Sequence, residues 1–317
     1  MSRPQPNRGS GAAVTGQRIA VTGASGAIGS RLIALLKSRG FSVVALQRDA
    51  GFTHGEDIDI RPFTLADSVE TMAEHLHDVD QLVHLAAIIP GKVPGDEGDA
   101  ALWNVNVLGT QRLVEAMALA KVKRLVLTGT ANVYRSDQAE ASEESPFGPQ
   151  SRVLYLASKA AQEWLAASMC NEHDIDHAIL RISSVIGDGR SIIDKLACDL
   201  ASGIPVHIQD GAAFGADFID CEDVCAGLLL AVETELNGVY NLSSGKRTEL
   251  IDIVIKLAEI LGRPSDAIQM VHANRAPDTG FPAINSDRLQ SFGFAPKPLF
   301  TVLQRIAESA TSRVKTA

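Results

Sequence analysis

Residues 18–49 read RIAVTGASGAIGSRLIALLKSRGFSVVALQRD, and this stretch decides the fold. A short apolar run is followed by a turn that contains Gly23, Gly26 and Gly29, and then by apolar residues at helical spacing. Gly40 ends the helical pattern, and a second apolar run follows it. The stretch therefore predicts a strand, a glycine-rich turn, a helix and a second strand, which is the building unit of a parallel sheet with crossover helices.

The glycine-rich turn has a chemical interpretation as well as a structural one. Glycines at a strand-to-helix turn let the backbone approach a pyrophosphate, whose charge is favoured by the helix N-terminus. A turn with only a structural role is the alternative, and the position between a strand and a helix near the N-terminus disfavours it. The sequence predicts a dinucleotide site that includes Gly23, Ser25, Gly26, Ala27, Ile28 and Gly29.

The end of the second strand bears on which dinucleotide binds. An acidic residue at this place would accept hydrogen bonds from the adenosine ribose, whereas the strand here ends in Leu46, Gln47 and Arg48. Arg48 is placed to pair with a 2′-phosphate, which favours NADP. Asp49 becomes the ribose acceptor if the turn is shifted by one residue, and a solvated Arg48 is the simpler alternative, so NAD stays open.

Strand and helix patterns continue to alternate along the chain. We expect further strands and helices at 57–63, 68–76, 80–87, 103–119, 124–127, 154–170 and 177–183. This alternation predicts an α/β fold, a Rossmann-like doubly wound parallel sheet that binds its ligand at the carboxyl ends of the strands. We divide the chain into a flexible tail at 1–16, an NAD(P)-binding Rossmann domain at 17–183 and a smaller C-terminal α/β substrate-binding region at 184–317, interleaved with the end of the sheet.

The composition argues against several classes of protein. The net charge of −9 and the lack of a basic cluster disfavour a nucleic-acid partner. No apolar run reaches the roughly 18 residues of a membrane span, and the first residues lack the apolar core of a signal peptide. The four cysteines show neither metal-ligand nor disulfide spacing. We therefore expect a cytoplasmic protein with no membrane partner and no metal site.

Tyr155 and Lys159 stand four residues apart in a stretch that reads as an amphipathic helix, VLYLASKAAQEWLAA. Residues at this spacing are neighbours on a helix, so the Lys159 ammonium can lie beside the Tyr155 phenol. A nearby cation favours the phenolate and lowers a pKa that is ordinarily near 10. The pair therefore predicts proton exchange of the kind that interconverts a hydroxyl and a carbonyl, with an ordinary surface pair as the alternative.

Several motifs together resemble one family. The chain is similar, over residues 17–310, to the extended short-chain dehydrogenase/reductase superfamily, and within it to the NAD-dependent epimerase/dehydratase family that modifies nucleotide sugars. The matching motifs are TGASGAIG at 22–29, HLAA at 84–87, NVLGT at 106–110, Tyr155-x-x-x-Lys159, DFIDCEDV at 217–224, GVYNLSSG at 238–245 and DRLQSFGFAPK at 287–297.

The resemblance implies a role for each site residue. Tyr155 would be the general acid/base, Lys159 would lower its pKa and hold the nicotinamide ribose, Thr130 would bond the substrate oxygen and Asn106 would support the site. The cofactor would also contact Arg48, Thr64, Leu65, Leu85, Ala86, Ala87, Thr128, Tyr155, Lys159 and Ile182. The substrate, a nucleotide sugar, would contact Thr130, Asn132, Tyr155, Ser184 and Arg275. His84 is expected to be structural, and the helices at 103–119 and 154–170 would form a homodimer.

The chain departs from the family pattern at four places. Ala131 and Asn132 stand where sugar-nucleotide 4,6-dehydratases carry an Asp-Glu pair, so dehydration is disfavoured, and the Glu of decarboxylases is missing too. Ser184 replaces an Asn, and Ala216 replaces an Arg whose diphosphate contact Arg275 would supply. Thr64 stands where an adenine-contacting Asp is common, unless the third strand is registered on Asp59.

The sequence therefore favours C4 ketoreduction of a nucleotide-linked 4-keto-6-deoxy sugar. A nucleotide-sugar 4-epimerase that retains NAD would use the same residues and is the first alternative. A reductase of a non-nucleotide sugar or another small carbonyl is the second, because Ser184 and Ala216 depart from the pattern. The third is a non-catalytic NAD(P)-binding scaffold, which would not need Tyr155, Lys159 and Thr130 together.

Overall fold

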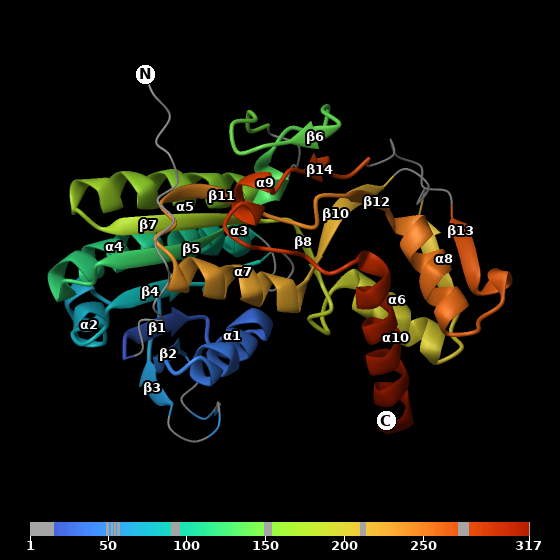
Figure 1. Cartoon of the computed structure of the whole chain (residues 1–317), viewed down its shortest axis with the longest axis horizontal. Coiled ribbons are helices and arrows are strands. Elements are labelled where there is room, and N and C mark those ends of the chain that lie inside the picture. Colours follow the sequence, from blue (N-terminus) through green and yellow to red (C-terminus); the bar gives the residue numbers. More distant parts are fainter. Residues whose placement is uncertain are drawn as a thin grey trace.

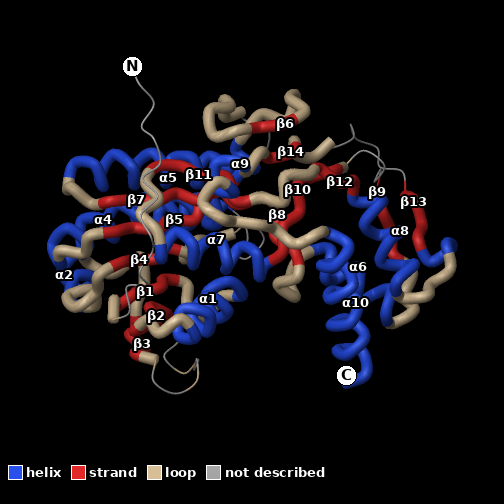
Figure 2. Tube along the Cα trace, viewed as in Figure 1, coloured by secondary structure: helices blue, strands red, loops and turns tan. Residues whose placement is uncertain are grey.

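The computed structural model describes residues 16–48, 51, 53, 55, 58–89, 96–148, 154–209, 214–271 and 279–316. Its largest sheet has seven strands, each parallel to its neighbours, in the order β11–β7–β5–β4–β1–β2–β3 (Figures 1 and 2). The strands are β1 (Arg18–Thr22), β2 (Ser42–Gln47), β3 (Asp59–Pro62), β4 (Gln81–His84), β5 (Arg124–Thr130), β7 (Asp176–Ile182) and β11 (Gly238–Leu242). The predicted Rossmann-like doubly wound sheet is confirmed.

Helices cover both faces of this sheet. One face packs against α1 (Ala27–Ser38) and α7 (Cys221–Glu233), and the other against α2 (Val69–Glu74), α4 (Gly109–Ala120) and α5 (Leu154–Glu172). Strands β1, β4 and β5 are therefore buried along nearly their whole length. Burial on both faces explains why these strands read as continuous apolar runs in the sequence.

The segment 96–120 differs from the single helix expected at 103–119. It consists of α3 (Asp96–Trp103), a π-helical turn η1 (Asn104–Leu108) and α4. A π-helical turn inserts an extra residue into the helix and changes the direction of the side chains that follow. Asn106 lies in this turn and is fully buried, so the irregular turn itself positions one of the predicted site residues.

The chain after β7 builds a second core beside the sheet (Figure 1). Its elements are β8 (Ser184–Ile186), α6 (Ile192–Ala201), β9 (Val206–Gln209), β10 (Gly215–Asp220), β12 (Arg247–Glu249), α8 (Leu250–Ile260), β13 (Ile268–Val271) and α10 (Leu299–Thr316). Two segments of this region return to the first core, because β11 pairs with β7 and α7 covers a face of the main sheet. No helix in the described part of the chain is long and apolar enough to cross a membrane.

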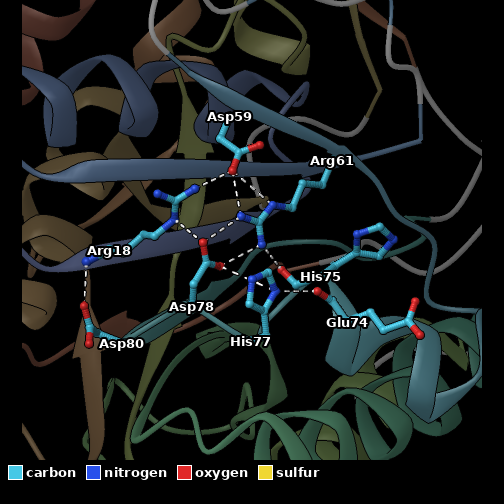
Figure 3. Close-up of polar contacts among 8 residues, drawn as sticks. All are labelled: Arg18, Asp59, Arg61, Glu74, His75, His77, Asp78 and Asp80. Atoms are coloured by element: carbon cyan, nitrogen blue, oxygen red, sulfur yellow. Dashed lines mark hydrogen bonds and ion pairs between the residues drawn. The ribbon is translucent and has the colours of Figure 1, made fainter.

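Four charged side chains connect the amino ends of the strands (Figure 3). Arg61 donates to Asp59 (2.7 and 3.1 Å) and to Asp78 (2.9 and 3.0 Å), and Arg18 pairs with Asp59 and with Asp78 (3.1 Å). Hydrogen bonds from Arg61 are the largest cause that holds the pKa of Asp59 and the pKa of Asp78 below their usual value. The cluster joins β1 and β3 to the segment before β4, at the edge opposite the glycine-rich turn.

Replacing Arg61 by methionine should lower the free energy of unfolding by about 1 kcal/mol at neutral pH, a modest loss because solvent screens the partly exposed carboxylates. Each carboxyl has a lower pKa when folded than when unfolded. Its stabilisation is therefore complete above the unfolded value of about 4 and is lost as the pH falls through the folded value. Urea unfolding at neutral pH and at about pH 3 should show a smaller loss of stability in acid for Arg61→Met than for the native protein. Arg39→Met, which removes the pair with Glu233, is the control. If Arg61→Met and Arg39→Met lost the same free energy of unfolding between neutral pH and about pH 3, the prediction would be contradicted.

Candidate active site

The glycine-rich turn lies against the carboxyl end of β4. Gly23 has φ of +65°, and a Cβ there would lie 3.0 Å from the nitrogen of Ala86, while a Cβ at Gly29 would lie 2.8 Å from the carbonyl oxygen of Ala24. Neither position has room for a side chain. Helix α1 begins after Gly26, which has no side chain to cap the first turn, so the N–H groups there suit an anionic ligand. The turn fits the pyrophosphate of a dinucleotide.

The other predicted cofactor residues also lie where strands end. They are Arg48 after β2, Thr64 and Leu65 after β3, Leu85, Ala86 and Ala87 after β4, Thr128 two residues before the end of β5, and Ile182 at the end of β7. Because these strands are parallel, the positions share one edge of the sheet with the glycine-rich turn. Arg48 is exposed there. The contacts of these residues with a cofactor stay a prediction.

The register of β3 decides between two candidates for the adenine contact. Asp59 is the first residue of β3 and binds two arginines at the amino edge of the sheet, so the alternative assignment to Asp59 is wrong. Thr64 follows the carboxyl end of β3, and its N–H and hydroxyl donate to the carboxylate of Asp67 (2.8 and 3.0 Å). Asp49, the alternative ribose acceptor, lies outside the described residues.

Tyr155 and Lys159 both lie in the first two turns of α5, and the acceptors that the Lys159 ammonium binds are other groups than the phenol. The Lys159 ammonium donates to the carbonyl oxygen of Thr128 (2.8 Å) and to Oε1 of Gln162, while no described residue hydrogen-bonds the Tyr155 hydroxyl. Burial raises the pKa of Tyr155 to about 12 and lowers the pKa of Lys159 to about 8. Desolvation of the phenol therefore moves the Tyr155 pKa upward, opposite to the lowering that the helix spacing predicts.

Thr130 ends β5, and its side chain is buried. Its Oγ1 accepts a hydrogen bond from the N–H of Asn132 (3.3 Å) and caps the short 3-10 turn η2 (Ala131–Val133), against which α5 packs. The two residues after Thr130 are Ala131, which is fully buried, and Asn132. Neither of them carries a carboxyl group. A hydroxyl at this strand end can donate to a substrate oxygen.

Asn106 connects three parts of the site. Its Oδ1 accepts from the N–H of Ile88 (2.8 Å), and its Nδ2 donates to the carbonyl of Ile88 (3.1 Å) and to Oγ of Ser158 (3.1 Å). Ser158 in turn donates to the carbonyl of Tyr155 (2.7 Å). Because both amide hydrogens of Asn106 are used, this residue holds the segment after β4 against the first turn of α5 and supports the site through its packing.

A buried ion pair beside the end of β5 was not predicted. Nε of Arg181 donates to both carboxylate oxygens of Glu163 (3.0 and 3.1 Å), and Nη1 donates to the hydroxyl of Tyr134 (2.7 Å), which donates to Oδ1 of Asn241 (2.7 Å). The side chains of Glu163 and Arg181 are only 4% and 7% exposed. A Cβ at Gly129 would lie 3.2 Å from Oε2 of Glu163. An arginine inside the apolar strand HAILRIS was the available sequence signal.

The predicted substrate residues are only partly described. Ser184 begins β8 and is half-buried, and Asn132 lies in η2. Ala216 stands where the family commonly has an Arg. It is fully buried inside β10 and has no charged group. Arg275, expected to replace it, lies outside the described residues. The substrate contacts of Ser184 and Asn132 stay predictions.

Known proteins resemble this chain in sequence and structure. The sequence pattern of the NAD dependent epimerase/dehydratase family matches residues 19–243. The low-salt glycan biosynthesis protein Agl12 of Haloferax volcanii is 28% identical over 88% of this chain and 93% of its own length. A UDP-glucose 4-epimerase of Mycolicibacterium smegmatis is 30% identical over 78% and 84%, and the relatives include a dTDP-glucose 4,6-dehydratase of Streptomyces griseus. MoeE5, solved in complex with UDP-glucuronic acid and NAD, is 29% identical over 93% of this chain and 99% of its own, with a TM-score of 0.81.

Proposed function

The chain belongs to the NAD-dependent epimerase/dehydratase family, and we propose that it transfers a hydride at C4 of a nucleotide-linked sugar, as the reductase of a 4-keto-6-deoxy sugar. The observation that carries this proposal is the hydroxyl of Tyr155, to which no described residue makes a hydrogen bond, on a helix that packs against the turn capped by Thr130. MoeE5 and the epimerase of M. smegmatis, which resemble this chain over most of its length, have UDP-sugars as ligand or substrate.

The geometry supports a specific role for each side chain. A bound nicotinamide cofactor supplies the hydride. Tyr155, whose pKa of about 12 keeps the phenol protonated at neutral pH, donates a proton to the carbonyl oxygen, which is the proton movement that reduction requires. Thr130 donates a hydrogen bond to the same oxygen. Lys159, buried beside Thr128, supplies positive charge that stabilises the phenolate left by proton transfer.

The structural relatives were solved with NAD, and NADP is our proposal for this chain. Arg48 is exposed after β2 and can pair with a 2′-phosphate as two neighbouring N–H donors. Reduction of a keto sugar also suits an exchangeable, reduced cofactor.

The position of Ala131 argues against a 4,6-dehydratase. Removal of water from C5 and C6 needs an acid and a base beside Thr130, and Ala131 and Asn132 supply neither. A 4-epimerase remains the second candidate, because Tyr155, Lys159 and Thr130 serve both directions of hydride transfer. A reductase of a non-nucleotide carbonyl and a non-catalytic cofactor-binding scaffold are the remaining candidates.

The nucleotide that the purified protein retains is the sharpest test. The protein should be purified, denatured gently and its released ligand identified by mass, and NADPH and NADH should then be titrated against the ligand-free protein. A reductase should release little cofactor, bind NADPH more tightly than NADH and oxidise it with dTDP-4-keto-6-deoxyglucose. Retained NAD with interconversion of UDP-glucose and UDP-galactose would establish the epimerase instead, and cofactor binding without turnover of either sugar would sink the proposal.

We also propose that the protein is a homodimer formed through α4 and α5. Large apolar side chains are exposed on these helices and on the adjoining α3 and η1. They are Trp164 (70% exposed), Leu119 (58%), Trp103 (41%), Leu108 (36%) and Leu154 (36%). A surface of this kind is typical of a protein interface. Analytical ultracentrifugation should give twice the chain mass of 33.7 kDa, and a monomer at working concentration would contradict the proposal.

A further inference from the structure

A chain of buried polar side chains runs from β1 to Lys159. Oγ1 of Thr22, the last residue of β1, lies 2.7 Å from Nδ1 of His84, and Nε2 of His84 lies 3.0 Å from Oγ1 of Thr110. Nε2 of Gln162 lies 2.8 Å from the same Thr110 hydroxyl, and Oε1 of Gln162 accepts from the Lys159 ammonium. All five side chains are buried. This series of hydrogen-bonded side chains connects β1, the strand before the glycine-rich turn, to Lys159 in the candidate active site.

The proton positions along this series of side chains follow from the hydrogen bonds that Thr22 and Thr110 make with backbone groups. Oγ1 of Thr22 already accepts from the N–H groups of Leu85 and Ala86 (3.1 and 3.2 Å), so its own proton points to Nδ1 of His84. His84 then carries its proton on Nε2 and donates to Thr110.

The Thr110 hydroxyl donates its hydrogen bond to the carbonyl oxygen of Asn106 (2.8 Å), so its oxygen accepts from both His84 and Gln162. The amide of Gln162 can only present its nitrogen to Thr110 and its oxygen to Lys159. Nε2 of Gln162 also lies 3.4 Å from Nε2 of His84, and since both atoms are donors this contact adds no bond.

The directions exclude a proton relay through His84. Burial, with the charge of Lys159 as the second cause, lowers the pKa of His84 to about 3, so the imidazole stays neutral with its Nδ1 unprotonated through the physiological range. His84 is neutral and lies between the hydroxyl groups of Thr22 and Thr110, whose hydrogen bonds have fixed directions, so its role is structural. Its effect is to fix which end of the Gln162 amide faces the lysine.

We propose that Gln162 is a positioning residue that holds the Lys159 ammonium in the active site through an amide oriented by Thr110 and His84. The proposal rests on the proposed function in assigning Lys159 to that site. The carbonyl of Thr128 on β5 is the second acceptor of the ammonium. Without Gln162, the buried ammonium would lose one of the two acceptors that the described residues provide, and its charged form would be less stable.

Other titratable groups around Lys159 also affect its pKa. On α5 the nearest is Glu163, which favours the ammonium and is itself paired with Arg181 of β7. Tyr155 on α5 and His84 on β4 are neutral near pH 8, where burial has moved the pKa of Lys159. Gln162 is an uncharged acceptor, so replacing it by another uncharged residue changes the hydrogen bonding of the Lys159 ammonium and leaves the surrounding charges as they are.

The test follows the ammonium of Lys159 directly in the ligand-free protein. Nitrogen NMR of lysine-labelled protein, with the Lys159 signal assigned through Lys159→Met, gives its titration midpoint. Gln162→Met, which keeps the length and removes the acceptor, should lower the midpoint by about one unit, and Gln162→Glu, which places a carboxylate there, should raise it by about one unit. Thr110→Val, which frees the amide to turn, should give a smaller fall than Gln162→Met.

The controls separate positioning from general damage. Gln290→Met, at the exposed end of the short helix α9 (Asp287–Gln290), should leave the midpoint unchanged. If Gln162→Met does not fold, the upward shift with Gln162→Glu is compared with Thr110→Val, because water admitted by lost packing would raise the midpoint in Thr110→Val as well, whereas a carboxylate at residue 162 raises it only in Gln162→Glu. An unchanged midpoint in a folded Gln162 variant would overturn the proposal. Failure of every nucleotide sugar as substrate would overturn the proposed function and leave these midpoints as they are.

Discussion

Replacing Tyr155 by phenylalanine should lower turnover of the sugar substrate by about 10²–10⁴-fold, the range that general acid–base catalysis contributes. The substitution removes only the hydroxyl, and no described residue makes a hydrogen bond to that hydroxyl. The melting temperature should therefore stay near the native value. Loss of absorbance of the reduced cofactor with the keto-sugar substrate measures the rate, and thermal unfolding checks the fold.

A second tyrosine provides a matched control for this experiment. The hydroxyl of Tyr240 donates to the carbonyl of Asn237 (3.3 Å), and its ring lies under the guanidinium of Arg288 (4.6 Å). Tyr240→Phe removes the same atom from a place away from Thr130 and should retain nearly full turnover. Turnover of Tyr155→Phe within threefold of the native rate would show that the phenol is not the proton donor.

Replacing Glu163 by alanine should lower the free energy of unfolding by about 3–5 kcal/mol. The loss is large because Arg181 would remain buried with its charge unpaired, and its guanidinium also bonds Tyr134 and lies 4.6 Å from the ring centre of Phe147. Urea unfolding at neutral pH measures the effect. Turnover measured well below the unfolding transition should fall less than in Tyr155→Phe, since Glu163 does not touch the reacting atoms.

The buried pair also allows a double replacement. When Glu163 and Arg181 are both changed to methionine, no isolated charge remains in the interior, so the double variant should be more stable than Glu163→Ala. The exposed pair between Lys256 and Glu259 (2.7 Å) is the comparison. Glu259→Ala should cost less than about 1 kcal/mol. A loss for Glu163→Ala as small as for Glu259→Ala would contradict the assignment of a buried, unscreened ion pair.

The cofactor edge of the fold could be predicted because its signals are local. The glycines of 23–29 and the apolar runs on either side specify a strand, turn and helix from residues that are neighbours in the chain. The same holds for the helix of Tyr155, where spacing alone placed Tyr155 and Lys159 on successive turns. Register needed the structure, because only the pairing of β3 with β2 shows that Asp59 lies at the wrong edge and Thr64 at the right one.

The remaining features depend on contacts between distant segments. Gln162 and Glu163 follow one another on α5 and look like a solvent-facing pair in the sequence, yet both are buried. Thr110 of α4 binds Gln162 and Arg181 of β7 binds Glu163, and no local pattern in the sequence reveals these partners. Burial by distant segments also explains why the pKa of Tyr155 is raised and not lowered, because helix spacing does not show how deeply the phenol is covered.

The position of β11 has a consequence for how the chain reaches this structure during synthesis. Strand β7 ends at residue 182, but its outer edge is paired only when residues 238–242 arrive, and α7 must arrive first to cover one face of the sheet. Until then a nascent chain presents an open parallel edge and uncovered apolar surface, which are the features that promote aggregation. The ribosome must therefore release about three quarters of the chain before the main sheet is complete, so residues 17–183 are not a folding unit of their own.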